Sequence, residues 1–374
     1  MSVSASPASS TDKIREEILS RMKEKEKGKF KEATLEEAKE KLAPPWFTHT
    51  LKEPEGDEWV LLSTLIPNWQ ERKGIKDVKV RVFKREDYSP EALARIPDIN
   101  PAYRPNLKAI SELAYAVDHT ETPVLMTGPA SVGKTSLAEY FAAITNRPFF
   151  RFNYNGTMDA SSLLGTQSAK SGSTQWHDGL IAEAIQTKNA IVHNDEWTFC
   201  PPEVVISMQY LLERNGKLLL PDKPGTAEEK FIKPAPGVRL LFADNTKGNG
   251  DTTGKYVGTQ PQNSATLDRI GTFIQVDFLP KNDEIDMLLA VYPALTKRLA
   301  TAMVGVAGLC RTACNQGNLS IPLSARVLFS WVEHSLNLMD YQEGLNVAYL
   351  NRFDNESERQ AVLGFMQTVF AGGK

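Results

Sequence analysis

The feature that most constrains this chain is the segment GPASVGKT at residues 128–135. It matches the phosphate-binding pattern G-x-x-x-x-G-K-[ST], and it lies between an apolar segment, 124–126, and a helix-like segment, 136–143. Glycines let such a loop turn tightly, so that its backbone N–H groups surround a phosphate at the positive end of the following helix. We therefore expect a strand, a phosphate-binding loop (P-loop) and a helix here.

The residue types at the end of this loop specify what it would bind. Lys134 would reach the β- and γ-phosphates of a nucleotide, and the hydroxyl of Thr135 would be a ligand of Mg²⁺. The predicted nucleotide-binding residues are Gly128, Pro129, Ala130, Ser131, Val132, Gly133, Lys134, Thr135 and Ser136.

Short apolar segments alternate with helix-like segments around this loop. Such alternation predicts an α/β fold with a parallel sheet covered by helices on both faces. The candidate strands are 123–127, 148–153, 190–194, 238–243 and 272–278.

The periodicity of the chain predicts four parts. Residues 1–45 carry many charges of both signs and few large apolar side chains, which predicts a flexible charged tail. Residues 46–95 contain an apolar run and alternating valines, which predict a small module with β content. An α/β core over 96–280 follows, and helical periodicity over 281–374 predicts an all-α lid.

A pair of carboxylates follows the third candidate strand. A P-loop needs an acidic site that holds magnesium and prepares a water molecule for attack. We expect Asp195 to bind Mg²⁺ and Glu196 to orient the attacking water or accept its proton. His193 and Asn194 precede the pair, either as supporting groups or simply as polar residues at the end of a strand.

Three further residues are candidates for catalysis. Asn245 follows the fourth candidate strand and would bind the attacking water or the γ-phosphate, if that strand lies between those that carry the P-loop and Asp195. Arg269 precedes the last strand, and Arg326 opens a helix of the lid. A guanidinium at the γ-phosphate would neutralise developing charge, whereas an ordinary surface ion pair is the alternative for each arginine.

Charge and cysteine content exclude several other classes. The chain has 43 Lys and Arg against 46 Asp and Glu, a net charge of −3, so nucleic-acid binding is possible but not indicated. Three cysteines are too few for a disulfide framework, and the N-terminus has no apolar signal segment. The longest apolar stretch, 299–310, falls short of the ~18–20 residues that cross a bilayer. We expect a cytoplasmic protein that does not contact a membrane.

Taken together, these motifs resemble those of AAA+ ATPases, in particular the MoxR branch and the CobS-type ATPase subunit of cobaltochelatase. The segments that carry the resemblance are IPDINPAY at 96–103, the P-loop, Asp159 with LLG at 163–165, DGL at 178–180, Asp195 with Glu196, NT at 245–246, GDTTG at 250–254, GTQ at 258–260 and LDR at 267–269.

The resemblance implies ATP and Mg²⁺ as cofactors, ATP hydrolysis, and a homo-oligomer in the form of a hexameric ring. In such rings the position of Arg269 faces the nucleotide of the neighbouring subunit. It also implies two hairpins, within 161–176 and 216–236, that line the pore or contact a partner, and a protein partner with an integrin-like metal-binding domain that the motor remodels. Three alternatives stay open: the ATPase subunit of a cobalt or magnesium chelatase, a DNA-associated nucleotidase resembling a restriction motor, and a scaffold that binds nucleotide but barely hydrolyses it.

Overall fold

The computed structural model describes residues 58–371 except 68, 70–73, 171–172, 252–253 and 255. The expected charged tail, the first residues of the expected small module, and Thr252 and Thr253 of the GDTTG motif lie outside the described residues.

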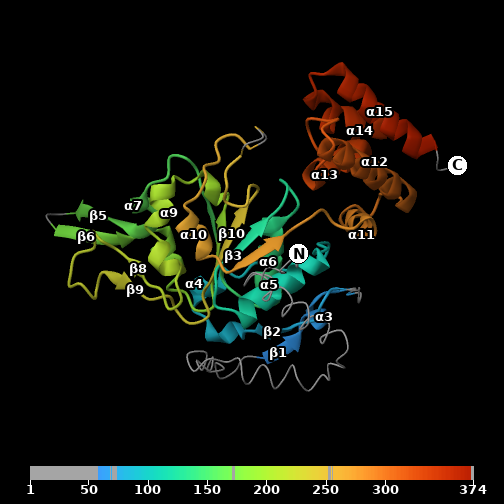
Figure 1. Cartoon of the computed structure of the whole chain (residues 1–374). Coiled ribbons are helices and arrows are strands. Elements are labelled where there is room, and N and C mark those ends of the chain that lie inside the picture. The colour runs from blue at the N-terminus through green and yellow to red at the C-terminus, as the bar shows by residue number, and fades with distance from the viewer. Residues whose placement is uncertain are drawn as a thin grey trace, which may run out of the picture. The chain divides into compact units, whose positions relative to one another are not determined.

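The centre of the fold is a five-stranded parallel sheet with the strand order β11-β3-β10-β7-β4 (Figure 1). Its strands are β3 (Val124–Thr127), β4 (Phe149–Asn153), β7 (Ile191–Asp195), β10 (Arg239–Asp244) and β11 (Thr272–Gln275). All five overlap the strands predicted from the sequence, which confirms the predicted sheet. Because β10 lies between β3 and β7, the P-loop, the carboxylate pair and Asn245 follow neighbouring strands.

Helices bury both faces of this sheet. On one face, α5 (Leu107–His119) and α6 (Lys134–Ile144) pack against Val124 and Met126 of β3. Leu125 points to the opposite face, as expected for alternating side chains of a strand. Burial on both faces explains why the strands read as apolar runs rather than as alternating patterns.

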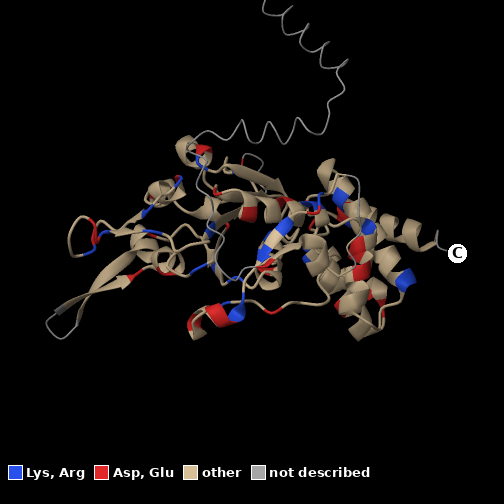
Figure 2. Ribbon diagram, turned by 90° about the horizontal axis from the view of Figure 1, so that it is seen from below, with Lys and Arg blue, Asp and Glu red and all other residues tan. Residues whose placement is uncertain are grey.

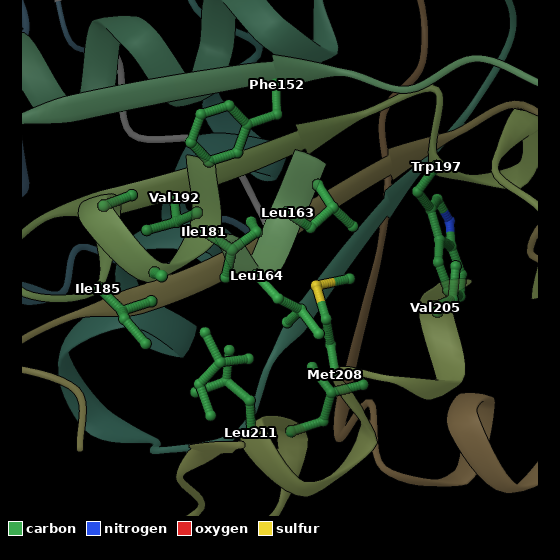
Figure 3. Close-up of a cluster of buried hydrophobic side chains, with 14 of the residues drawn as sticks. Phe152, Leu163, Leu164, Ile181, Ile185, Val192, Trp197, Val205, Met208 and Leu211 are labelled. Carbon is green, nitrogen blue, oxygen red and sulfur yellow. The ribbon is translucent and has the colours of Figure 1, made fainter. Parts of the chain in front are cut away.

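The opposite face of the sheet is covered by three short helices. They are α7 (Ala160–Leu164), α8 (Leu180–Ala184) and α9 (Pro202–Ile206). Their side chains converge on Phe152 of β4 and Val192 of β7 in one apolar cluster (Figure 3). Burial of apolar surface at ~25 cal/mol per Å² is the main force that holds these helices to the sheet.

Near the start of the described residues, β1 (Glu58–Leu61) and β2 (Lys79–Val82) pair antiparallel. Leu62 and Val80 pack in the same apolar cluster as α5. The connecting elements are α3 (Leu62–Leu65), η2 (Arg85–Asp87) and α4 (Pro90–Leu93), whose N-cap is Ser89.

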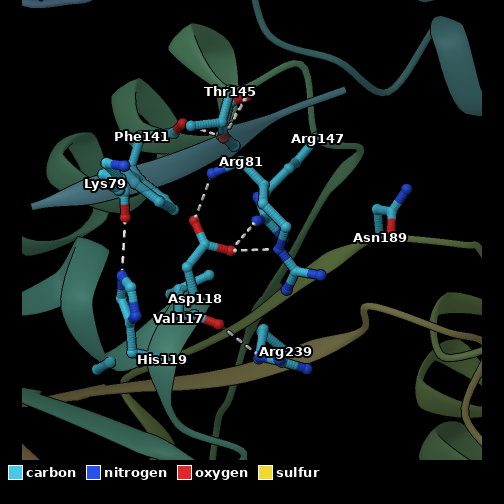
Figure 4. Close-up of polar contacts among 12 residues, drawn as sticks. Lys79, Arg81, Val117, Asp118, His119, Phe141, Thr145, Arg147, Asn189 and Arg239 are labelled. Carbon is cyan, nitrogen blue, oxygen red and sulfur yellow. Dashed lines mark hydrogen bonds and ion pairs between the residues drawn. The ribbon is translucent and has the colours of Figure 1, made fainter. Parts of the chain in front are cut away.

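A buried ion-pair cluster joins β2 to α5 and to the segment before β4 (Figure 4). Asp118 accepts hydrogen bonds from the backbone N–H (3.0 Å) and Nε (3.2 Å) of Arg81 and from Nη2 of Arg147 (2.5 Å). The guanidinium of Arg147 also lies 4.6 Å from the ring centroid of Phe83. Polar contacts therefore hold β2 to the core in addition to apolar packing.

Two antiparallel hairpins extend from the core; the first overlaps the segment 161–176 and the second lies within 216–236, where the family resemblance implied them. The first pairs β5 (Gly165–Lys170) with β6 (Ser173–Asp178), and the second pairs β8 (Leu218–Leu219) with β9 (Phe231–Ile232). Short helical elements complete this part: η3 (Trp197–Phe199), η4 (Gln209–Leu212) and α10 (Ser264–Asp268).

The C-terminal part of the described chain is helical, as predicted. Its elements are α11 (Lys281–Val291), α12 (Lys297–Asn315), α13 (Ala325–Leu338), α14 (Tyr341–Ala348), η5 (Leu350–Arg352) and α15 (Glu356–Ala371). They enclose a core of their own around Trp331 and Tyr349, and Arg311 of α12 forms a buried two-bond pair with Glu284 of α11 at 2.8 Å. Within the described ranges, no helix has both the length and the apolar character to span a membrane.

Candidate nucleotide-binding site

The loop between β3 and α6 has a backbone that requires its glycines. Gly128 has φ +154°, and a side chain there would collide with the carbonyl oxygen of Val276 on the neighbouring segment. Gly133 adopts a left-handed conformation at the N-cap of α6, with φ +91°. Both conformations are inexpensive only for glycine, and together they turn the chain sharply into the positive end of α6.

Lys134 is buried at the first turn of α6. Its ammonium donates hydrogen bonds to the carbonyl oxygens of Gly128 (2.9 Å) and Pro129 (3.1 Å) and to Oδ1 of Asn245 (2.6 Å). Burial lowers the pKa of Lys134, whereas the nearby carboxylates of Glu196 and Asp195 act in the opposite direction. The ammonium thus lies at the centre of the loop with all three donors engaged.

Thr135 and Asp195 supply adjacent oxygen atoms at the mouth of the loop. The hydroxyl of Thr135 donates to Oδ2 of Asp195 at 2.8 Å. Arg151 donates to the same oxygen through Nη2 (2.7 Å) and Nε (3.1 Å). A hydroxyl beside a carboxylate is the hard-oxygen set that suits Mg²⁺, which keeps several waters and needs few protein ligands. These two residues therefore fit the metal that the sequence predicted for them.

Glu196 and Asn245 contact each other across the ends of β7 and β10. Nδ2 of Asn245 lies 3.4 and 3.3 Å from the two carboxylate oxygens of Glu196. Burial raises the pKa of Glu196, and the negative charge of the neighbouring Asp195 raises it further, to a smaller extent. Asp244, in contrast, accepts bonds from Thr198 Oγ1 (2.8 Å) and the Asn245 N–H (2.7 Å), so it shapes the turn after β10.

One cavity of about 470 Å³ is lined by Lys134, Thr135, Asp195, Glu196 and Asn245, but not by Asp244. Of the other predicted binding residues, the cavity is also lined by Ala130, Ser131, Val132, Gly133 and Ser136. From α13, Arg326 lines the same cavity. A cleft with a few converging polar and charged groups is the usual form of a ligand site.

The structure does not bring Arg269 to this cavity. Its guanidinium pairs with Glu213, with Nη2 2.8 Å and Nε 3.1 Å from Oε1, and Nη1 donates to the carbonyl of Ala265 at 2.7 Å. The side chain is 30% exposed. Within one chain, Arg269 therefore forms the surface ion pair that was the alternative interpretation of this residue. A contact between Arg269 and a nucleotide would have to involve the nucleotide of another subunit.

The sequence analysis did not single out Arg151 and Asn153, which lie on β4 and also line the cavity. The signal was an arginine inside an otherwise aromatic strand, FFRFN at 149–153. His193 is buried beside them, with Nε2 4.0 Å from Oδ1 of Asp195, and burial lowers its pKa to about 4, so the ring is neutral.

Asn194 has a structural role on the other face of the sheet. Its Nδ2 donates to the carbonyl of Leu241 at 3.0 Å, and its Oδ1 accepts from the hydroxyl of Tyr154 at 2.9 Å. It therefore links β7 to β10 and to the residue after β4, away from the cavity.

A P-loop after β3 of a parallel β11-β3-β10-β7-β4 sheet, followed by a helical lid, defines the AAA+ class of nucleotide-binding proteins. A family profile described as "AAA domain (dynein-related subfamily)" matches residues 123–269. The aerobic cobaltochelatase subunit CobS of a Sinorhizobium species is 31% identical over 302 residues, which cover 79% of this chain and 87% of that protein. The chain belongs to the AAA+ family, in the branch of CobS-type ATPases, as the resemblance predicted.

The chain is also similar to two further proteins. Midasin of Dictyostelium discoideum is 29% identical over 242 residues, which cover 63% of this chain but only 4% of midasin. Among solved structures, the RuvB Holliday junction branch migration motor of Thermotoga maritima is 12% identical and has a TM-score of 0.39, with 76% of this chain and 78% of that chain covered.

Proposed function

We propose that this protein is an Mg²⁺-dependent ATPase that works as a ring-shaped motor on a protein partner. The observation that carries the proposal is the convergence of Lys134, Thr135, Asp195, Glu196 and Asn245 on one cavity at the end of the P-loop. These residue types match the separate tasks of phosphate binding, metal binding and water activation.

Each side chain has a distinct part in the proposed reaction. Lys134 exchanges its bonds with the loop carbonyls for bonds with phosphate oxygens, and Thr135 and Asp195 hold the metal. Mg²⁺, when bound, would neutralise charge on the β- and γ-phosphates. Glu196 orients the attacking water and accepts its proton, a task that suits a carboxylate whose pKa burial has raised. Asn245 holds the water or the γ-phosphate with its amide.

The first test separates binding from hydrolysis. Lys134→Ala should abolish nucleotide binding, whereas Glu196→Gln should bind ATP but turn it over roughly 10²–10⁴ times more slowly, the usual contribution of a general base. Equilibrium binding and phosphate release would be measured on both, with Glu112→Gln, which changes a partly exposed glutamate on α5, as the matched control. Parental turnover by the Glu196→Gln variant would show that the base is another residue.

The ring assembly is proposed on the family membership and on the position of Arg269. AAA+ motors commonly act as closed rings, and we propose a homohexamer. Arg269 is partly exposed and does not line the cavity of its own chain, as expected for an arginine that is supplied to a neighbouring subunit. Arg326, which lines the cavity of its own chain, is then proposed to contact the phosphates in cis.

The partner is proposed from family membership: a protein that carries an integrin-like metal-binding domain. The likeness to CobS, over 87% of its length, favours a second candidate function, the ATPase subunit of a cobalt or magnesium chelatase. Lys, Arg, Asp and Glu are interspersed along the described elements (Figure 2), so a DNA-associated nucleotidase has less support. Competition between ATP and GTP tests that last alternative, because a clear preference for GTP would favour it.

A further inference from the structure

Arg151 is a charged side chain that the proposed reaction does not use, although it lies inside the cavity. Its guanidinium donates two hydrogen bonds, both to Oδ2 of Asp195, at 2.7 and 3.1 Å. Among the described residues, Asp195 is the only hydrogen-bond and ion-pair partner of this guanidinium. A cation therefore already lies at the carboxylate that is proposed to hold the metal.

The sheet fixes the backbone of Arg151 but leaves its guanidinium free to move. In the parallel register of β4 and β7, Arg151 is opposite His193, and Asn153 is opposite Asp195, so these side chains share one face. Phe150 and Phe152 are buried on the other face and anchor the strand. The Arg151 side chain, in contrast, is 54% exposed, whereas that of Asp195 is 8% exposed. The guanidinium can thus leave the carboxylate without disturbing the core.

We propose that Arg151 is an exchangeable counter-ion of Asp195, which neutralises the carboxylate in the absence of metal and yields it when Mg²⁺ and nucleotide bind. This inference rests on the proposed ATP site. Oδ2 of Asp195 accepts three hydrogen bonds, one from Thr135 and two from Arg151, so little of this oxygen is left for a metal or its water. Two cations at one carboxylate also repel each other, which favours departure of the guanidinium.

The exchange has a consequence for nucleotide binding without metal. When Arg151 is paired with Asp195, the guanidinium compensates the negative charge of the carboxylate. The phosphate groups of a metal-free nucleotide are then repelled less by Asp195. Without Arg151, metal-free nucleotide faces the carboxylates of both Asp195 and Glu196, while Mg²⁺ no longer competes with a guanidinium. Arg151 therefore weakens the coupling between metal and nucleotide binding. The factor by which Mg²⁺ raises the affinity for nucleotide equals the factor by which nucleotide raises the affinity for Mg²⁺.

The test is the ratio of the ADP dissociation constant in EDTA to that in excess Mg²⁺, measured by calorimetry for the parental protein and for Arg151→Met. Methionine keeps an unbranched side chain but removes the charge. We expect the ratio to rise by about fivefold or more, the equivalent of an exposed ion pair of ~1 kcal/mol. Arg151→Lys keeps the charge and should stay near the parental ratio. Arg214→Met, which removes a partly exposed arginine that pairs with Glu121 at 3.3 Å, is the matched control and should leave the ratio unchanged.

Each outcome decides the inference. An Arg151→Met ratio equal to or below the parental ratio overturns it, because the arginine would then be idle or would orient Asp195 for the metal. Should Arg151→Met fail to fold in a thermal unfolding check, Arg151→Gln takes its place in the same comparison. If the parental protein binds ADP under neither condition, the proposed nucleotide site itself is wrong, an outcome distinct from an unchanged ratio.

Discussion

Replacing Asp118 with asparagine should strongly destabilise the fold, because this carboxylate compensates two buried arginines. The side chains of Asp118 and Arg147 are fully buried, and that of Arg81 is 4% exposed. Within the described part of the chain, Nε and Nη1 of Arg147 and Nη2 of Arg81 already have no hydrogen-bond partner. Asparagine would keep the shape of the side chain and one acceptor, but it would leave both guanidinium groups without an opposite charge.

The expected loss follows from the burial of the pair. Removing one partner of a buried ion pair costs ~3–5 kcal/mol, since the remaining charge stays in a medium of low dielectric constant. Burial lowers the pKa of Arg147, and Asp118 is the first group that opposes this effect. For domains of 150–250 residues, each kcal/mol corresponds to roughly 2–4 °C in melting temperature. We therefore expect the melting temperature to fall by on the order of 10 °C.

The assay is thermal unfolding followed by circular dichroism, at low and high salt. The matched control is Glu121→Gln, which removes the carboxylate from an ion pair with Arg214. In this pair the side chain of Glu121 is 38% exposed and that of Arg214 is 42% exposed. Its loss should be at most ~1 kcal/mol and should shrink further at high salt. If Asp118→Asn melts within a few degrees of this control, the buried arginines do not depend on the carboxylate, and the reasoning fails.

Two other predictions concern assembly and thiol chemistry. Because Arg269 does not line the cavity of its own chain, Arg269→Ala should keep nucleotide binding but reduce turnover by a factor of about 10³–10⁵. The turnover of the parental protein per subunit should rise with protein concentration. A turnover that does not depend on concentration would argue against a contact between subunits. Burial raises the pKa of Cys200 and Cys310 to about 12, so their reactive thiolates are scarce near pH 8 and become common only as pH approaches 12. Both should be alkylated slowly in the native protein and quickly after denaturation, as mass spectrometry would show, and fast native alkylation would contradict their burial.

The fold was largely predictable because burial on both faces leaves a clear trace in sequence. The candidate strands 190–194 and 238–243 each begin and end one residue too early, since β7 spans Ile191–Asp195 and β10 spans Arg239–Asp244. A carboxylate at the end of a parallel strand still forms the backbone ladder, although its side chain ends the apolar run. Within the predicted helical lid, α14 has little sequence signal of its own, because only Met339 and Asp340 separate it from α13 and its eight residues give little periodicity.

The candidate site was predictable where a motif or the strand order points to it. Asn245 depended on a condition, a strand between those of the P-loop and Asp195, and the strand order fulfils it. Arg151 could not be found in this way. It is 44 residues from Asp195 in sequence, and only the register of β4 with β7 brings the two together. The roles of these residues stay predictions until the variants are measured.

The side-chain amide of Asn245 contacts both Lys134 and Glu196, one through a hydrogen-bond acceptor and the other through a donor. Its oxygen faces the ammonium of Lys134, and its nitrogen faces the carboxylate of Glu196. A half-turn of the amide would set oxygen against carboxylate and N–H against ammonium, so the charges on either side allow one orientation. If a phosphate drew the ammonium away, as proposed, the amide oxygen would lose its partner while the nitrogen kept its own. Phosphate binding at Lys134 would then reach Glu196, the proposed base, through a single planar side chain.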